Sequence, residues 1–200
     1  DVAEPGRLGR LYAAGAWPGT DSLVVDHHVT NPGFGTINVI DPERSSTAEI
    51  VLDLLEALTA PIDADVATCL LTGLVTDTLG FRTSSTNART FDAAQRLLAS
   101  GACLGEVTQQ AFYRRSLASL KLTAIALDRL EISGPFACSW LERRDLDATG
   151  ARPEAARGVT GLLASAAEPE VIALLRENAN GEIDVSLRSK PGVDLVPAAA

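Results

Sequence analysis

The sequence predicts a two-domain α/β protein, with a parallel-sheet domain joined by a helical linker to a smaller mixed α/β domain. Three observations lead to this prediction. The first half alternates apolar, strand-like runs with amphipathic helical patterns. A largely helical stretch follows, and the second half then has two pairs of strand patterns separated by a helix. We place the two domains at residues 1–110 and 111–200.

The predicted elements of the first half follow in order along the chain. Residues 23–26 indicate a buried apolar strand, and residues 33–40 an irregular or short extended segment. Ser46 and Glu49 have the spacing of a capping box, in which each side chain bonds the backbone of the other residue, so a helix should begin there. The apolar face of this helix would carry Ile50, Leu54, Leu55 and Leu58.

Two further helices complete the first half. One should begin near Asp63 and end near Asp77. The next should run over residues 86–100, with Gly101 in the position that commonly ends a helix. An apolar strand followed by several helices favours a mostly parallel sheet that is covered by helices.

The second half of the chain has a different pattern. Residues 104–130 are mostly helical, and residues 130–141 are typical of a hairpin. A helix is predicted over 153–166, and a strand pair over 171–176 and 183–188, joined by an Asn- and Gly-containing turn. The core candidates of the helical stretch are Leu117, Leu120, Ile125 and Leu127.

Composition argues against several classes of protein. A net charge of −9 is not expected of a protein that coats long duplex DNA or RNA, because such a protein needs a basic surface. No apolar stretch approaches the roughly 20 residues that a membrane helix needs, so we expect no membrane partner. Cys69, Cys103 and Cys138 are widely spaced in apolar settings, which favours reduced core thiols in a cytoplasmic protein.

The candidate chemistry lies where Asp26, His27 and His28 follow the first strand. In open α/β sheets, ligands bind at the carboxyl ends of the strands. Asp1 and Asp77 add carboxylates that are remote in sequence, as ligands gathered from different elements would be. Carboxylates with some imidazole suit Mn²⁺ or Mg²⁺, and two such ions can promote hydrolysis of a phosphate ester.

Each candidate also has a purely structural interpretation. A histidine pair at the end of a strand is, without further context, more often structural or exposed. Asp77 could simply be a polar residue at a helix end, and Arg188 an exposed residue of a strand. Arg82, soon after Asp77, could face a substrate or only solvent.

Several motifs, taken together and in this order, resemble those of the DHH phosphoesterases. They are Asp1 followed by Arg7-Leu8-Gly9, then Val25-Asp26-His27-His28, then Asp41-Pro42 with Ser46-Thr47-Ala48-Glu49, then Gly73-Leu74-Val75-Thr76-Asp77-Thr78. The later segment Val185-Ser186-Leu187-Arg188-Ser189-Lys190 resembles the DHHA1 domain that follows in that family. The best match is the branch of bacterial bifunctional oligoribonucleases, or nano-RNases, that also act as 3'-phosphoadenosine-5'-phosphate (pAp) phosphatases.

The resemblance implies a role for each residue of the first domain's site. Asp1, His27 and Asp77 are the implied metal ligands, Asp1 bridging two Mn²⁺ ions, with Mg²⁺ as the alternative. His28 and Asp77 are the implied catalytic residues, His28 contacting the scissile phosphate or assisting the leaving group. Asp26 would orient an imidazole from behind.

On the DHHA1 side, the resemblance implies that Arg188 and Ser189 bind substrate. The forked guanidinium of Arg188 suits a terminal phosphate. The substrate should lie in a cleft between the two domains. Expected substrates are short RNA, hydrolysed to 5'-mononucleotides, and pAp, hydrolysed to AMP, with cyclic or linear di-adenylate as further candidates. A homodimer remains open.

Two motifs of the family are not found between residues 1 and 200. The first, a His and two Asp on the opening strand, would lie upstream of Asp1, and a Gly-Gly-Gly-His loop would follow Ala200. We therefore expect an internal fragment, lacking the start of the DHH domain and the end of the DHHA1 domain, and expect the isolated fragment to be inactive.

Three rival functions remain at this point. A family pyrophosphatase would carry a different second domain, which the Ser-Leu-Arg-Ser-Lys segment argues against. A RecJ-like single-strand DNA exonuclease would need a DNA-binding domain that this acidic chain does not indicate. A nucleotide-binding sensor that has lost catalysis would be recognised by loss of the upstream His/Asp/Asp motif.

Overall fold

The computed structural model describes residues 1–13, 21–190, 192, 193 and 195. The chain divides into two compact units, Asp1–Arg114 and Arg115–Ala200, and each is described here by itself. The boundary between them follows Arg114, whereas the predicted domain boundary lies between residues 110 and 111. Within the described residues, no helix is both long and apolar enough to cross a membrane.

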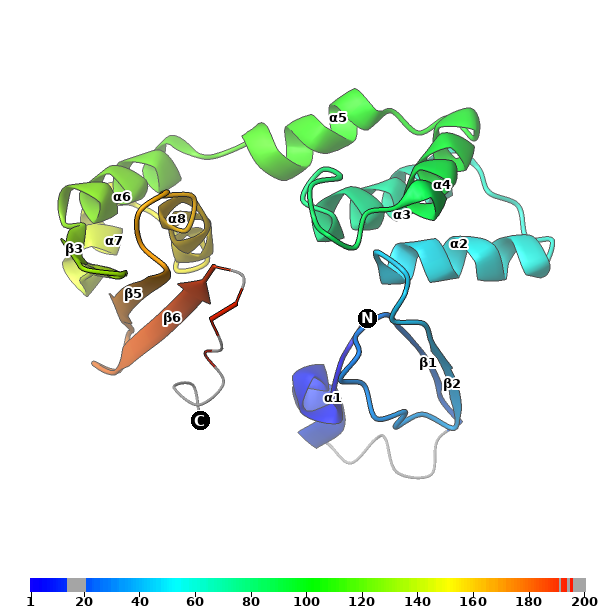
Figure 1. The fold of residues 1–200 in the computed structure, drawn as a ribbon, viewed down its shortest axis with the longest axis horizontal. Helices are drawn as coiled ribbons and strands as arrows, with labels where there is room; N and C mark the ends of the chain where they lie inside the picture. Colours follow the sequence, from blue (N-terminus) through cyan, green and yellow to red (C-terminus); the bar gives the residue numbers. More distant parts are fainter. Residues whose placement is uncertain (14–20, 191, 194, 196–200) are drawn as a thin grey trace. The chain divides into compact units, whose positions relative to one another are not determined.

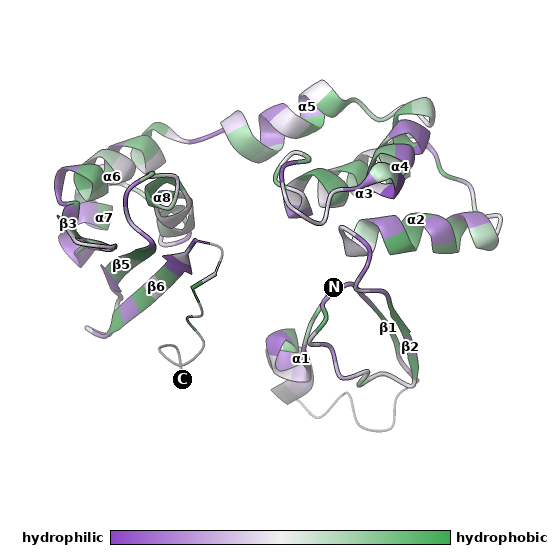
Figure 2. Ribbon diagram, viewed as in Figure 1, coloured by the Kyte–Doolittle hydropathy of each residue, from purple (hydrophilic) through white to green (hydrophobic). Residues whose placement is uncertain are grey.

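Unit 1 begins with two short helical turns, continues with a short parallel sheet and ends with helices (Figure 1). Its elements are a 3₁₀ turn Pro5–Leu8, α1 Arg10–Ala13, β1 Leu23–Asp26, β2 Ile37–Ile40, α2 Thr47–Ala57, α3 Ala64–Asp77, α4 Ala88–Ala99, α5 Leu104–Thr108 and a π-helical turn Gln109–Tyr113. The predicted strand is confirmed with its predicted ends, and the three predicted helices are confirmed with shifted ends. β1 and β2 pair in parallel from Leu23 with Ile37 to Asp26 with Ile40. Figure 2 shows both strands as largely hydrophobic.

Helix α3 is the centre of the unit 1 core, and it packs against α2, α4 and α5. Its fully buried face carries Ala67, Leu71, Leu74 and Val75, a spacing that places them on one side of a helix. The carboxylate of Asp63 caps this helix by accepting hydrogen bonds from the amides of Asp65 and Val66. Because both ends of α3 are fixed by caps and packing, its last residue, Asp77, has a defined position.

The face of α2 that is buried differs from the predicted one. Ile50 is buried, but so is Leu52, while Leu58 lies past the last residue of the helix and is 72% exposed. The predicted capping box is only half formed. Ser46 accepts from the amide of Glu49 at 3.3 Å, but the Glu49 carboxylate bonds Ser45 and Arg44 instead of reaching the Ser46 amide.

Unit 2 is a four-stranded mixed sheet with its helices packed into one core. Its elements are α6 Leu117–Asp128, β3 Glu131–Ser133, β4 Phe136–Leu141, α7 Arg143–Thr149, α8 Ala155–Leu163, β5 Val171–Glu177 and β6 Ile183–Ser189. The sheet order is β3-β4-β5-β6, with β4 and β5 parallel and the two outer pairs antiparallel. Both predicted strand pairs and the predicted helix are confirmed. Helix α7 was not predicted.

The predicted core positions of α6 are largely wrong. Leu117, Leu120 and Leu127 are 67%, 48% and 47% exposed, and Ile125 lies at the margin of the core. The helix buries Leu122 and Ala126 instead. The apolar residues of α6 are spread over all faces of the helix, so its sequence does not mark one face for burial. The elements that it contacts, α7, α8 and β4, decide which face is buried.

The cysteines also differ from expectation. All three are free thiols, as predicted, but Cys69 and Cys103 are exposed rather than in the core. Cys138 is partly buried in β4, and burial raises the pKa of its thiol.

Candidate metal centre

Four of the predicted site residues come together in unit 1. His27 and His28 follow β1, Asp77 ends α3, and Asp1 lies beside them. The Nε2 atom of His27 is 3.8 Å from Oδ1 of Asp1 and 3.8 Å from Oδ2 of Asp77. Two carboxylates from remote parts of the sequence therefore converge on one imidazole nitrogen.

The position of the His27 ring leaves that nitrogen available as a ligand. Its other nitrogen, Nδ1, is 3.3 Å from the backbone carbonyl oxygen of Arg44. A carbonyl oxygen only accepts, so Nδ1 carries the hydrogen and Nε2 of the neutral ring presents its lone pair. A backbone acceptor behind the ring is the usual partner of a metal-binding histidine.

The ring of His28 is held in the same way by Asp26. Its Nδ1 atom is 2.8 Å from Oδ1 of Asp26, which makes Nδ1 the donor and leaves Nε2 free of that contact. The Nδ1 atom is also 3.6 Å from Oδ1 of Asp1. Asp26 thus contacts the ring of His28, and it contacts His27 only through the backbone amide, at 2.9 Å.

Asp26 is a fully buried carboxylate with a complete set of donors. Besides the two histidines, the side-chain amide of Asn31 donates to it at 2.6 Å and also to the carbonyl of Val2 at 3.1 Å. Burial alone would raise the pKa of Asp26, but the hydrogen bonds from Asn31, His28 and the His27 amide outweigh it and lower the pKa to about 2. Asp26 is therefore a fixed negative charge behind the two imidazoles.

Asp77 has the opposite electrostatic situation. Burial raises the pKa of its carboxyl, and the nearby His27 and His28 only partly oppose that effect. Within the part of the chain that the structure describes, no residue donates a hydrogen bond to this carboxylate. A partly buried carboxylate without donors is stabilised by a cation, so this position suits a metal ligand.

Asp1 completes the set from the solvent side. Its side chain is 52% exposed, and its Oδ1 atom accepts a hydrogen bond of 3.2 Å from the hydroxyl of Thr47, the first residue of α2. Ligand atoms of Asp1, His27 and His28 all lie within 4.8 Å of one another. This grouping adds His28 to the candidate ligands, a position for which the resemblance implied contact with the scissile phosphate or assistance to the leaving group.

These residues fit a divalent cation by the chemistry of their donors. Two carboxylates and two imidazoles face a common region, and backbone or carboxylate acceptors fix both rings. Carboxylate oxygens suit Mg²⁺ and Mn²⁺, and imidazole nitrogens suit transition-metal ions, so the mixed set fits a divalent cation without selecting one.

Sequence reasoning missed the residues that support this cluster. Arg44 is held by salt bridges to Asp41 at 3.1 Å, Glu49 at 3.0 Å and Asp53 at 2.7 Å, and its carbonyl is the one that fixes His27. Asp41 and Glu49 stand in the quoted motifs, but no contact with Arg44 was predicted for either. Asn31 carried no signal, because its contacts with Asp26 and Val2 depend on the folded loop after His28.

Arg188 and Ser189 lie in unit 2, at the end of β6, and are described apart from the metal cluster. Both are exposed. A terminal nitrogen of Arg188 donates to the carbonyl of Leu187 at 2.9 Å, and the hydroxyl of Ser189 donates to the carbonyl of Val193 at 2.9 Å.

The chain is similar to curated hydrolases, although no family model matches it. It is 38% identical over 114 residues to the "Bifunctional oligoribonuclease and PAP phosphatase NrnA" of Thermus thermophilus, covering 57% of this chain and 34% of that protein. It is 37% identical over 115 residues to the "Cyclic-di-AMP phosphodiesterase GdpP" of Geobacillus thermodenitrificans, covering 55% of this chain and 17% of that protein. The matched part thus spans about a third, or less, of these relatives.

A solved structure has the same fold. An exopolyphosphatase-related protein from Bacteroides fragilis matches 95% of this chain and 57% of its own, with a TM-score of 0.86 and 24% sequence identity. That likeness shows the fold, and the curated relatives are phosphodiesterases and phosphatases. Together with the ordered motifs around Asp26, His27 and His28, these similarities support a relationship to the DHH/DHHA1 phosphoesterases, close to the NrnA proteins.

Proposed function

We propose that the protein containing this chain is a metal-dependent phosphoesterase that hydrolyses short oligoribonucleotides to 5'-mononucleotides and pAp to AMP. Cyclic or linear di-adenylate is a further candidate substrate. The observation that carries the proposal is the convergence of the Asp1 and Asp77 carboxylates on Nε2 of His27, at 3.8 Å each. The activities for which the NrnA and GdpP relatives are named supply the substrate classes.

Asp1, His27 and Asp77 would hold the metal ions, two Mn²⁺ or Mg²⁺. Such ions lower the pKa of water and neutralise charge on the phosphoryl oxygens. The residues of this chain must keep their carboxylates ionised and their Nε2 atoms unprotonated for that purpose. In the neutral ring of His27, the carbonyl of Arg44 fixes the hydrogen on Nδ1, so that Nε2 presents its lone pair.

His28 is the proposed contact to the scissile phosphate. Because Asp26 accepts from Nδ1, the Nε2 atom of His28 is the one that can meet a phosphoryl oxygen or the leaving group. If His28 is protonated, Asp26 stabilises the imidazolium, and Nε2 can then donate a proton to the departing oxygen. His28 also belongs to the group of ligand atoms that lie within 4.8 Å of one another with Asp1 and His27, which gives it a second candidate role as a metal ligand, and metal titration separates this role from the first.

On the unit 2 side, Arg188 and Ser189 are the proposed substrate contacts. Among the described residues, one terminal nitrogen and Nε of Arg188 have no hydrogen-bond partner, so its guanidinium can donate to a phosphate. The proposed partners are therefore short RNA or nucleotides, not membranes or long duplexes. Free thiols are consistent with a cytoplasmic location, which we include in the proposal.

The test uses the full-length protein with Mn²⁺, assayed side by side against pAp, a nano-RNA and linear and cyclic di-adenylate. Asp77→Asn should lower kcat/KM by at least about 100-fold and abolish Mn²⁺ binding measured by calorimetry. Asp65→Asn is the matched control, because it removes an exposed carboxylate from the first turn of the same helix. Wild-type metal affinity and turnover in Asp77→Asn would refute the ligand assignment.

A second outcome separates enzyme from sensor. If the wild-type protein binds pAp or di-adenylate with Mn²⁺ present but hydrolyses none of the four substrates, the rival function of a nucleotide-binding sensor replaces the proposal.

A further inference from the structure

The loop after Asp77 has an unusual backbone. Leu79, Gly80 and Phe81 follow one another with φ values of 49°, 73° and 65°, all in the left-handed region. Glycine adopts such angles freely, but residues with larger side chains, such as Leu79 and Phe81, rarely do. Backbone strain of this kind persists only where the surrounding structure enforces it, and it gathers at functional sites.

Contacts on both sides enforce this conformation. The buried hydroxyl of Thr78 donates to the carbonyl of Leu74 at 2.7 Å and accepts from the amide of Phe81 at 3.0 Å. The Phe81 ring stacks on Phe91 of α4, with ring centroids 5.2 Å apart. The loop is therefore tied to both α3 and α4.

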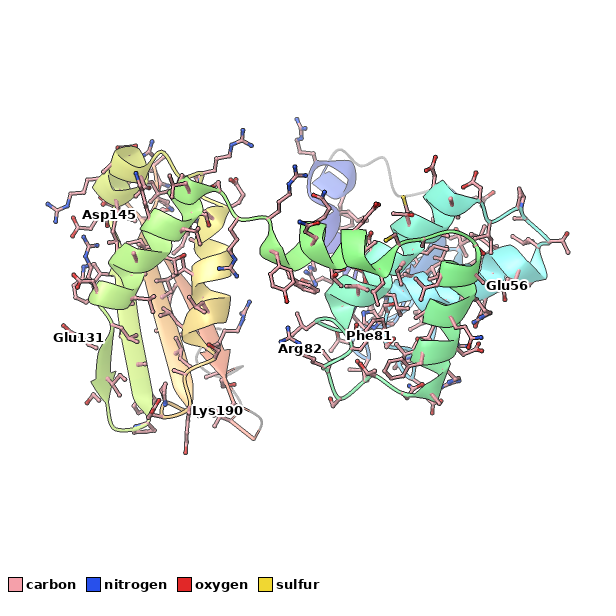
Figure 3. The ribbon with its side chains drawn as sticks, turned by 90° about the horizontal axis from the view of Figure 1, so that it is seen from above. Glu56, Phe81, Arg82, Glu131, Asp145 and Lys190 are labelled. Atoms are coloured by element: carbon pink, nitrogen blue, oxygen red, sulfur yellow. The ribbon has the colours of Figure 1, made fainter. Side chains whose placement is uncertain are left out.

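The result of this conformation is a fixed direction for Arg82. The backbone amide of Arg82 donates to the carbonyl of Thr78 at 2.8 Å. This hydrogen bond ties the backbone of Arg82 directly to the residue that follows Asp77. Its Nε donates to the carbonyl of Leu79 at 2.7 Å. Figure 3 shows the side chain extending out of the loop, away from α4.

Arg82 differs from the other arginines beside α2 and α4. Arg44, Arg89 and Arg96 all pair with carboxylates, Arg89 with Glu43 at 3.3 Å for example. Within the described part of the chain, no carboxylate pairs with Arg82, and its two terminal nitrogens have no hydrogen-bond partner. In a chain with 26 acidic residues, an exposed guanidinium without an acidic partner, held by its own backbone, has two parallel donors available for an external anion.

We propose that Arg82 binds a non-scissile phosphate of the substrate, as a specificity-determining contact within unit 1. The inference rests on the proposed phosphoesterase function. Arg82 lies five residues after Asp77, in the loop that follows this candidate metal ligand, so a substrate with its scissile phosphate at the metal ions would have Arg82 as a nearby cation of unit 1 for a second phosphate. In pAp this group would be the 5'-phosphate, which remains on the AMP product.

The test compares pAp with 3'-AMP, which has the same scissile phosphate but no 5'-phosphate. In the full-length protein with Mn²⁺, Arg82→Ala should lower kcat/KM for pAp roughly 10- to 100-fold more than for 3'-AMP, mainly through KM. Arg82→Lys should recover part of the loss, because it keeps the charge but not the fork. The matched control is Arg89→Ala, which removes an exposed arginine already paired with Glu43 and should leave both substrates as in wild type.

A binding measurement gives a second readout that a purely structural role would not move. Calorimetry should show AMP binding weakened by Arg82→Ala in the same proportion, with adenosine binding little changed. If Arg82→Ala lowers kcat/KM equally for pAp and 3'-AMP, or lowers it for neither, the inference about Arg82 is overturned. Turnover by the wild-type protein in the same assay would still uphold the proposed function. Absence of turnover in wild type would instead refute the function, and the AMP titration would still test Arg82.

Discussion

A buried aspartate stands in each unit, Asp26 at the end of β1 and Asp145 in the first turn of α7. Arg129 donates to Asp145 through both terminal nitrogens, at 2.6 and 2.9 Å, and the Glu142 amide adds a bond of 2.7 Å. Asp26 is bound instead by an amide side chain, a backbone amide and an imidazole.

The difference lies in what neutralises each charge. At Asp145 the permanently charged guanidinium of Arg129 pairs with the carboxylate, so the negative charge of Asp145 is neutralised within unit 2. At Asp26 no described arginine or lysine pairs with the carboxylate, so its negative charge acts on the two histidines and on whatever they bind. Removing one partner of a closed pair leaves a buried charge uncompensated, whereas a carboxylate without a cationic partner is available to a cation or a proton.

The largest expected effect tests the closed network. Asp145→Asn should lower the free energy of unfolding by about 3 kcal/mol, because it leaves Arg129 mostly buried without its counter-charge. Thermal and urea unfolding measure this. Asp147→Asn, which removes an exposed carboxylate of the same helix, should cost less than about 0.5 kcal/mol. Equal stability of the two variants would contradict a structural role for the Arg129 pair.

The next effect concerns the open side of unit 1. Mn²⁺ at a hundredfold excess over its Kd should stabilise the wild-type protein by about 2.7 kcal/mol. Asp77→Asn should lose this gain, yet without metal it should be no less stable than wild type, since burial disfavours the ionised carboxyl. Differential scanning fluorimetry with and without Mn²⁺ checks both halves. A metal-free variant that melts well below wild type would make Asp77 a structural residue.

The elements that were predicted well are those whose signal is local. The cap at Asp63, the turn between β5 and β6 and the apolar run of β1 act within a few residues, so the sequence contains the whole cause. The buried face of α6 could not be predicted in this way. Leu120 and Leu122 are equally apolar, and only packing against other elements separates the exposed one from the buried one.

The candidate site shows the same division. Asp1, His27 and Asp77 were chosen because their motifs occur in a known order, and the structure brings them together. Local pattern alone favoured a structural histidine pair. Asn31 and the carbonyl of Arg44 could not be predicted, because a loop amide and a backbone oxygen gain their roles only after folding.

A smaller effect tests whether Asp26 acts through the histidines. Asp26→Asn should lower kcat/KM about 10- to 100-fold, since an amide can hold His28 in the wrong tautomer or orientation. Nitrogen NMR of the imidazoles would show a changed protonation pattern at His28. Asp21→Asn, an exposed aspartate just before β1, is the control. Unchanged rates in Asp26→Asn would show that its charge does not reach the chemistry.

The smallest effect is the acid response of the closed pair. Burial alone would raise the pKa of Asp145, but the hydrogen bonds and charge of Arg129 lower it below the ordinary 3.8. A lowered folded pKa means that the pair stabilises the protein above about pH 4 and loses that contribution as the pH falls through the folded value. The stability gap between wild type and Asp145→Asn should therefore narrow as the pH is lowered from about 5 towards 3, measured by urea unfolding without metal. A gap that stays constant over this range would mean that the Asp145 carboxylate is not the group whose charge the pair depends on.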